Sequence, residues 1–178
     1  MAEPLTTAEA KAHLRVTDTS EDDLIDAYVV AARVWVEEYT GHILDQREVV
    51  DAFPAWGDFL TLRHQPITVD DPTPTLIVMY EDAEGDVVEY EDRVIRDQTY
   101  PWTIYPPYGA SFPTLADNGT ITVTYTAGYD DAAAIPAPFK QAVRILIAAM
   151  HMSRGSISLE ATETARFILR AYRGAVLA

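Results

Sequence analysis

Two stretches of this chain, one near each end, carry apolar side chains at helical spacing, and the long stretch between them does not. From Leu24 to Tyr39 these side chains form two adjacent rows, and from Phe139 to Met150 they form one. An apolar stripe must be covered by another element before a helix is stable in water. We therefore expect the two ends of the chain to pack together, with the helix containing Leu24 well buried.

The middle of the chain has the pattern of short strands. Apolar, β-branched and aromatic runs alternate there with clusters of Pro, Gly and Asp, which favours antiparallel strands over βαβ units. The clearest run has Ile121, Val123 and Tyr125 on one face, and residues 82–86 between two other runs are typical of a hairpin turn. The runs predicted as strands are 47–53, 59–62, 76–80, 87–90 and 120–126.

The expected architecture is one α+β domain over residues 1–178. Helices from the two ends form a bundle, and an antiparallel β insertion occupies about 46–127. The helices are predicted at about 7–16, 20–40, 137–153 and 159–173.

Local signals mark some of the boundaries. Thr7 and Ser20 are expected to cap the first two helices, because a hydroxyl at that position accepts a hydrogen bond from a backbone N–H of the first turn. Gly41 follows the second helix, where a residue with positive φ is favoured. Residues 100–113 contain four prolines, so they cannot form a regular helix and are expected to be a loop.

Composition and charge exclude several classes of protein. The chain has no cysteine, which excludes disulfides, Cys-based zinc sites and a thiol nucleophile. We expect no secretory signal and no membrane span. A net charge of −15 argues against broad nucleic-acid binding.

The charge is also uneven. Residues 1–135 hold 26 acidic and 7 basic side chains, whereas residues 136–178 hold 2 acidic and 6 basic ones. The basic end is either an interaction tail or a counter-charge to the acidic body of the same fold.

No catalytic or cofactor motif is present. Glycine-rich phosphate loops, a nucleophile elbow and the HExxH pattern are all missing. The acidic run from Glu81 to Asp92 lacks the spacing of a calcium loop and is expected to be a solvated hairpin. We predict no catalytic, cofactor or metal site. The four histidines are scattered along the chain: His13, His42, His64 and His151.

Two segments have the composition of contact surfaces. Large aromatic side chains gather in the proline-rich loop, and arginines follow one side of the last helix with aromatic residues beside them. In both cases the alternative is packing within the chain's own fold. The loop residues are Trp102, Tyr105 and Tyr108, and the helix residues are Arg166, Phe167, Arg170, Tyr172 and Arg173.

Blocks spread along nearly the whole chain carry a family resemblance. They are PLTTAEAKAHLRV at 4–16, DDLI at 22–25, EYTG at 38–41, YTAGY at 125–129, IPAPFKQA at 135–142 and AYR at 171–173. In this order and spacing they resemble the head–tail connector (adaptor) proteins of tailed phages and gene transfer agents. One departure is HMSRG at 151–155, where relatives often carry an aromatic-rich stretch ending in Arg-Glu.

The resemblance implies a structural virion protein rather than an enzyme, without cofactors. Family members form a ring, usually a dodecamer, beneath the portal at the neck of siphophage-like particles, and they are assembled in the host cytoplasm. The ring extends the DNA channel, through which DNA passes without specific binding, and joins the capsid to a stopper or tail-terminator protein.

The resemblance also implies which surfaces meet which partners. The C-terminal segment, roughly 156–178, would reach the portal through Arg166, Phe167, Arg170, Tyr172 and Arg173. Trp102, Tyr105 and Tyr108 would lie on the ring or tail side.

Two other functions are left open by the residues. A non-viral acidic protein-interaction module would share every feature above. A metal-assisted hydrolase would have to bring a histidine and a carboxylate together and retain metal on purification. The candidates for that cluster are His42 or His64 with Asp51, Asp58 or Asp70.

Overall fold

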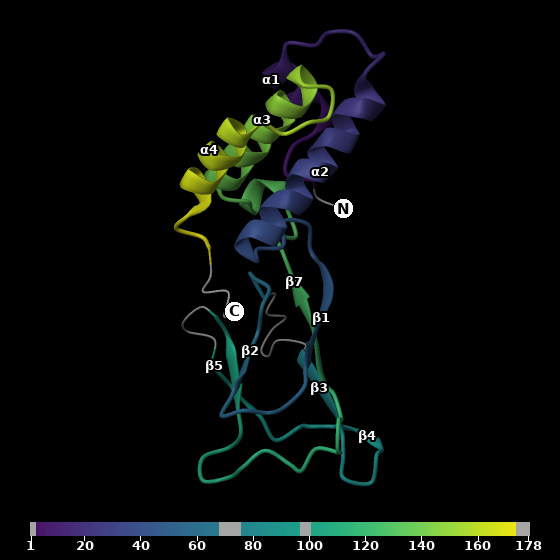
Figure 1. Ribbon diagram of the computed structural model, residues 1–178, viewed down its shortest axis with the longest axis vertical. Helices are drawn as coiled ribbons and strands as arrows, with labels where there is room; N and C mark the ends of the chain where they lie inside the picture. The colour runs from purple at the N-terminus through teal and green to yellow at the C-terminus, as the bar shows by residue number, and fades with distance from the viewer. Residues whose placement is uncertain (1–2, 68–75, 97–100, 174–178) are drawn as a thin grey trace. The chain divides into compact units, whose positions relative to one another are not determined.

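The computed structural model describes residues 3–67, 76–96 and 101–173 (Figure 1). They form two compact units, a helical unit from the two ends of the chain and a β unit of residues 47–127. The predicted α+β class, with helices from both ends and antiparallel strands between them, is confirmed. No described helix is long and apolar enough to cross a membrane.

The helical unit contains four α-helices and one short 3₁₀ turn. In this unit α3 lies between α2 and α4 (Figure 1). Its core joins residues from both ends of the chain, such as Val29 and Val36 with Val143, Ile147 and Leu169, all at most 2 % exposed. The elements are α1 (Thr7–Leu14), α2 (Asp22–Thr40), η1 (Ala132–Ala134), α3 (Ala137–Met152) and α4 (Leu159–Leu169).

Only part of the apolar surface of α2 is covered. The row of Ile25, Val29, Ala32 and Val36 is buried, and Tyr28 is buried beside it. Leu24 and Ala31 of the other predicted row are exposed. The expectation that this helix is well buried is therefore wrong for one side of it.

The cap of the first helix lies one residue before the predicted one. Thr6, not Thr7, accepts a hydrogen bond from the N–H of Glu9 at 3.2 Å, and the Glu9 carboxylate accepts one from the N–H of Thr6 at 2.9 Å. Thr7 instead donates its hydroxyl to Asp26 at 2.7 Å, which ties α1 to α2. The helix ends at Leu14 because Arg15 takes a left-handed φ of 60°.

The other helix ends agree with the prediction only in part. Ser20 does not cap α2, because the helix begins at Asp22 and Glu21 occupies the cap position. The N–H of Ser20 donates to the Asp18 carboxylate at 3.0 Å. Gly41 does end α2, with a φ of 73°. The last helix stops at Leu169, so Tyr172 and Arg173 lie beyond it.

The β unit contains two antiparallel sheets. The larger has the order β1-β7-β3-β4 and the smaller the order β2-β6-β5. All five runs predicted as strands are strands, whereas β5 and β6 were not predicted, and β6 lies inside the expected loop. The strands are β1 (Arg47–Phe53), β2 (Leu60–Thr61), β3 (Leu76–Glu81), β4 (Val87–Glu89), β5 (Val94–Arg96), β6 (Thr103–Tyr105) and β7 (Ile121–Ala127).

The chain enters and leaves the β unit at adjacent positions. Arg47 is paired with Ala127 in the β1–β7 ladder, and the N–H of Gln46 donates to the carbonyl of Tyr129 at 3.2 Å. Gly128 lies between these contacts with a φ of 116°. A Cβ atom there would lie 2.6 Å from the Cα of Gln46, so glycine alone fits.

Candidate interaction surfaces

Of the five candidate contact residues predicted for the last helix, Arg166, Tyr172 and Arg173 contact the chain's own helical unit. The guanidinium carbons of Arg166 and Arg173 lie 5.9 and 5.5 Å from the ring centroid of Tyr39 on α2. The ring of Tyr172 packs against Phe139, with centroids 4.7 Å apart. Packing within the fold, the alternative reading of the sequence, therefore describes these three side chains.

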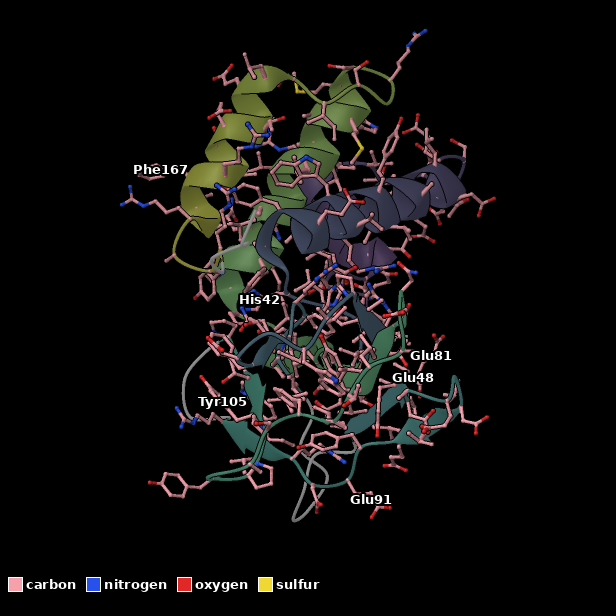
Figure 2. The ribbon with its side chains drawn as sticks, turned by 60° about the horizontal axis from the view of Figure 1, so that its bottom comes forward. His42, Glu48, Glu81, Glu91, Tyr105 and Phe167 are labelled. Atoms are coloured by element: carbon pink, nitrogen blue, oxygen red, sulfur yellow. The ribbon has the colours of Figure 1, made fainter. Side chains whose placement is uncertain are left out.

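Phe167 and Arg170 point outward instead. Phe167 is 64 % exposed and lies on the outer side of α4 (Figure 2). The guanidinium carbon of Arg170 lies 4.5 Å from the Phe167 ring centroid, so the two form a stacked cation and ring at the surface. An exposed aromatic side chain with an arginine on it is typical of a protein contact.

The proline-rich stretch is held to the β unit at several points and free at its tip. Tyr105 stacks on Phe59 at 5.2 Å between centroids, and the guanidinium carbon of Arg96 lies 4.2 Å from the Tyr105 ring centroid. Trp102 is half-buried, and its carbonyl accepts a hydrogen bond from the N–H of Leu62 at 3.0 Å. Tyr108 is fully exposed. Of the three predicted loop residues, Tyr108 alone stands clear of the sheet.

An aromatic cluster that sequence reasoning missed anchors the far end of this stretch. Phe112 stacks on Trp56, with centroids 4.5 Å apart and planes 6° apart. Tyr80 and Tyr90 meet the Trp56 ring at their edges, at 5.4 and 5.5 Å. Among the described residues, the buried Trp56 Nε1–H has no hydrogen-bond partner. The aromatic residues of this stretch therefore contribute to an internal cluster as well as to the surface.

The β unit carries most of the net negative charge of the protein. Residues 47–127 hold 14 acidic and 4 basic side chains, a net charge of −10. Glu48, Glu81 and Glu91 lie at the outside of the unit (Figure 2). Asp82 has a structural role in the predicted hairpin, because its carboxylate accepts from the N–H groups of Glu84 and Asp86 at 3.0 and 2.9 Å.

A histidine and a carboxylate do come together in the β unit. His64 Nδ1 lies 3.3 Å from Asp51 Oδ1, and Asp51 Oδ2 accepts from the Arg63 N–H and the Tyr125 hydroxyl, both at 2.8 Å. Burial would raise the pKa of Asp51, but the hydrogen bonds from His64, the Arg63 N–H and Tyr125 outweigh it and hold the pKa below its ordinary value.

This pair is not part of a metal-binding group within the described part of the chain. Asp51 is 2 % exposed, and both of its oxygens already have partners. Asp58 is exposed, and Asp70 lies outside the described residues. No group of three His, Cys, Asp or Glu side chains that could hold a metal ion occurs among the residues described.

His42 lies apart from this cluster, in the helical unit. Its ring packs against Phe139 and Tyr172, with centroids 4.9 and 5.8 Å away. Burial lowers the pKa of His42 to about 4. It is therefore a neutral core side chain at neutral pH.

The chain is similar to one family model and to several solved structures. Residues 5–62 match the model described as phage gp6-like head-tail connector protein. No curated protein matches the sequence. A protein from the neck of an empty gene transfer agent (GTA) particle, computed with C6 symmetry, is 25 % identical with a TM-score of 0.78, over 100 % of this chain and 95 % of that one.

Two further structures come from native GTA particles. One, from a neck computed with C12 symmetry, is 25 % identical with a TM-score of 0.74, over 99 % of this chain and 91 % of that one. The other, from a virion, is 24 % identical with a TM-score of 0.75 over 100 % of this chain and 94 % of that one, and shows the fold. The predicted resemblance to head–tail connector proteins is confirmed: residues 5–62 match the model of that family, and the whole chain is similar in structure to proteins of GTA necks.

Proposed function

We propose that this protein forms a ring beneath the portal of a phage-like particle and joins the head to the tail. One observation carries the proposal: the likeness to a GTA neck protein extends over the whole chain, through both units. The related necks were computed with C6 and C12 symmetry, which supports a cyclic ring, and we propose twelve copies. The two units act together as one connector subunit.

The portal side of this ring is the C-terminal end of the chain. Arg170 and Arg173 supply cations there, and Arg166 and Tyr172 hold the end of α4 against Tyr39 and Phe139. Residues 174–178 of the expected docking segment lie outside the described residues. A partner surface rich in carboxylates complements this end.

The tail side is the smaller sheet of the β unit. Tyr108 is exposed, and the stacked group of Phe59, Tyr105 and Arg96 lies on β6 and its neighbours. Rigid aromatic side chains supply contact area at low entropic cost. A stopper or tail-terminator protein is the partner we propose for this surface. The half-buried Trp102 supports the surface from within the β unit.

The acidic β unit borders the DNA channel in this proposal. A net charge of −10 on this unit repels the phosphate backbone, so the duplex passes without binding. We expect no retention of duplex DNA by the purified protein at low salt. The role is structural rather than catalytic.

The test is to mix the purified protein with the portal ring encoded near it and to image the product by electron microscopy. Stoichiometric decoration of one pole of the portal is the expected result. The variant Arg170→Glu should leave the fold intact and reduce decoration, because Arg170 lies on the exposed ring of Phe167. A bare portal beside folded, free protein would overturn the proposed function.

A further inference from the structure

The larger sheet of the β unit ends on β1, whose outer edge is long and regular. The order β1-β7-β3-β4 gives β1 a single neighbour. Its seven residues are all in register with β7, from Arg47 opposite Ala127 to Phe53 opposite Ile121. Within the described residues no other strand pairs with β1. One side of this strand therefore presents backbone groups that no ladder of the described chain uses.

The alternation of hydrogen bonds across the sheet identifies these backbone groups. The N–H of Tyr90 donates to the carbonyl of Val78 at 2.8 Å, so the even-numbered residues of β3 face β4 and the odd-numbered ones face β7. Followed through the register of β7, this alternation turns the odd-numbered residues of β1 toward β7. The N–H and C=O groups of Glu48, Val50 and Ala52 therefore point away from the sheet.

The side chains of these three residues are exposed on one face of the sheet. Val50 is 57 % exposed, and Glu48 and Ala52 are exposed on either side of it. Thr124 and Ile77 lie beside Val50 on the next two strands, and Ile77 is also exposed. A row without charge thus crosses three strands and reaches the edge at Val50.

The β1 edge lacks the features that protect sheet edges from pairing. Protected edges carry proline, lysine or a bulge, or are very short. Residues 47–53 contain no proline and no lysine, and their register with β7 has no bulge. The edge strands β4, β2 and β5 have only three, two and three residues. Among the described strands, β1 is the one long unprotected edge.

We propose that β1 pairs with β1 of a second copy of this chain, about a two-fold axis through Val50, so that the two larger sheets become one antiparallel sheet. Val50 is the middle residue of the strand, so this register pairs the whole length of both strands. Val50 faces its own counterpart, and Glu48 of each copy lies opposite Ala52 of the other. Each of these three pairs exchanges two backbone hydrogen bonds. A second copy is the partner because the edge is complementary to itself.

Charge and pairing select this register over its neighbours. The Glu48 residues of the two copies are four residues apart along the strands, about 14 Å, which exceeds the screening length of about 8 Å at physiological salt. Sliding one strand by two residues in either direction leaves an outward residue of each copy unpaired, and in one direction it also halves that separation. Asp51 is buried and bonded within its own chain, and Arg47 lies at the strand end opposite Phe53 of the second copy. The contact contains no ion pair, so backbone hydrogen bonds and the burial of Val50 stabilise it.

This two-fold pair is a state of the free protein. A ring is built head to tail by one repeated rotation, and a contact about a two-fold axis cannot be repeated around it. The pair covers the β1 edge before assembly, when an open edge would otherwise recruit other strands, and it separates as copies enter a ring. The inference goes beyond the proposed function and does not depend on the portal.

Opposite charges placed at the two-fold axis test the pairing. Val50→Lys and Val50→Glu each set two like charges opposite one another, and each should weaken the dimer of the full chain at least tenfold in analytical ultracentrifugation. An equimolar mixture of the two variants should restore the dimer, because lysine then lies opposite glutamate. Val87→Lys, at an exposed position of the short edge strand β4, is the matched control and should leave the dimer intact.

The fold of each variant is checked separately. Because Val50 is exposed, the melting temperature of each variant should equal that of the natural protein at concentrations where the natural protein is a monomer. A natural protein that stays monomeric at every concentration would overturn the inference and leave the edge to a strand of another protein. A mixture of the two charged variants that stays monomeric would also overturn it.

Cross-linking tests the register, since the chain has no native cysteine. With Val50→Cys, the two Cβ atoms of the pair lie about 5.5 Å apart, and a short bismaleimide should give a linked dimer and nothing larger. With Glu48→Cys they lie about 14 Å apart, and linking should be at least fivefold less. Equal linking at the two positions would overturn the proposed register. A ladder of larger species from Val50→Cys combined with Val87→Cys would show head-to-tail pairing of β1 with β4 and overturn the two-fold pair.

Salt distinguishes this contact from one held by opposite charges. Each β unit has a net charge of −10, so the two units repel one another across the pair. Raising the salt concentration from about 20 mM to about 500 mM screens that repulsion and should tighten the dimer. A dimer that weakens over this range would depend on ion pairs, and the inference would be overturned.

Discussion

Tyr125 on β7 donates its hydroxyl to the Asp51 carboxylate on β1 at 2.8 Å, within the interior of the β unit. The same hydroxyl accepts a hydrogen bond from the N–H of His64 at 3.1 Å. The Asp51 carboxylate also accepts from the N–H of Arg63. Two strands and the segment after β2 are thus joined through one buried carboxylate, which makes this group the polar centre of the unit.

Removing either partner of this pair should destabilise the β unit. Tyr125→Phe and Asp51→Asn each leave a buried polar group without its partner, and we expect the free energy of unfolding to fall by about 1–3 kcal/mol. Urea unfolding followed by tryptophan fluorescence measures the change, since Trp56 lies in this unit. Thr124→Val, on the other face of β7, is the matched control and should have little effect. An equal loss in the control would contradict the assigned role of the pair.

The same pair predicts a loss of stability in acid. The pKa of Asp51 in the folded protein lies below its ordinary value of 3.8, so its ionised form contributes fully above that value. This contribution disappears as the pH falls through the lower, folded-state pKa. Melting temperatures between about pH 5 and about pH 2 should therefore fall more steeply for the natural protein than for Asp51→Asn. Parallel curves would show that Asp51 is not the group responsible.

His42 predicts a second pH dependence in a higher range. Its folded-state pKa of about 4 lies below the ordinary value of 6.5, so the unfolded chain takes up a proton that the folded protein does not. The contribution of His42 to stability is fully present above about pH 6.5. The free energy of unfolding should fall by about 1–3 kcal/mol on going to about pH 4. His42→Gln has no titrating ring, and its urea midpoint should change less over this range. The prediction fails if the two proteins respond alike.

Tyr105 and Tyr108 should behave differently on substitution. Tyr105→Ala removes the stack with Phe59 and the contact with Arg96, which should cost about 1 kcal/mol of stability. Tyr108→Ala removes no contact within the fold and should leave the melting temperature unchanged. Both should weaken binding of a tail-side partner, measured by pull-down with the stopper or tail terminator. Full binding by Tyr108→Ala would remove this residue from the proposed contact.

Gly128→Ala should be among the most damaging small substitutions in the chain. The new Cβ would lie 2.6 Å from a backbone atom of Gln46, on a residue that already has a φ of 116°. We expect a loss of more than about 2 kcal/mol, from thermal unfolding. Gly85→Ala is the control, because it has a φ of 87° but nothing within 4 Å of the added Cβ, and it should cost about 1 kcal/mol. Equal losses would show that the close contact does not matter.

The sequence predicted the elements whose signal is long or repeated. Helical spacing over four or five turns identified α2 and α3, and strict alternation identified β7. β5 and β6 have three residues each, too few for a period to show, and β6 lies among prolines. Their position depends on pairing with each other and with β2, which no local pattern records.

The positions of the candidate surface residues in the fold were predicted less well, for a specific reason. Spacings of three and four placed Arg166, Arg170 and Arg173 on one side of a helix, but the helix ends at Leu169. Beyond that point the chain turns, and Tyr172 and Arg173 reach the core and Tyr39. The exposed side of α2 was predicted to be buried, because two adjacent rows of apolar side chains are typical of a buried helix. Local sequence does not tell which row the rest of the fold covers.

Arg47 and Ala127, the first and last residues of the β unit, are paired in the β1–β7 ladder, and this makes the unit an exchangeable part of the chain. A segment whose two ends lie side by side can be replaced by a short turn, or by a different segment, without moving the residues on either side. Among the described residues, the core of the helical unit contains none from 47–127, so it keeps its packing when that segment changes. Recombination between related genes can then replace the β unit in one genetic step and leave the helical unit as it was.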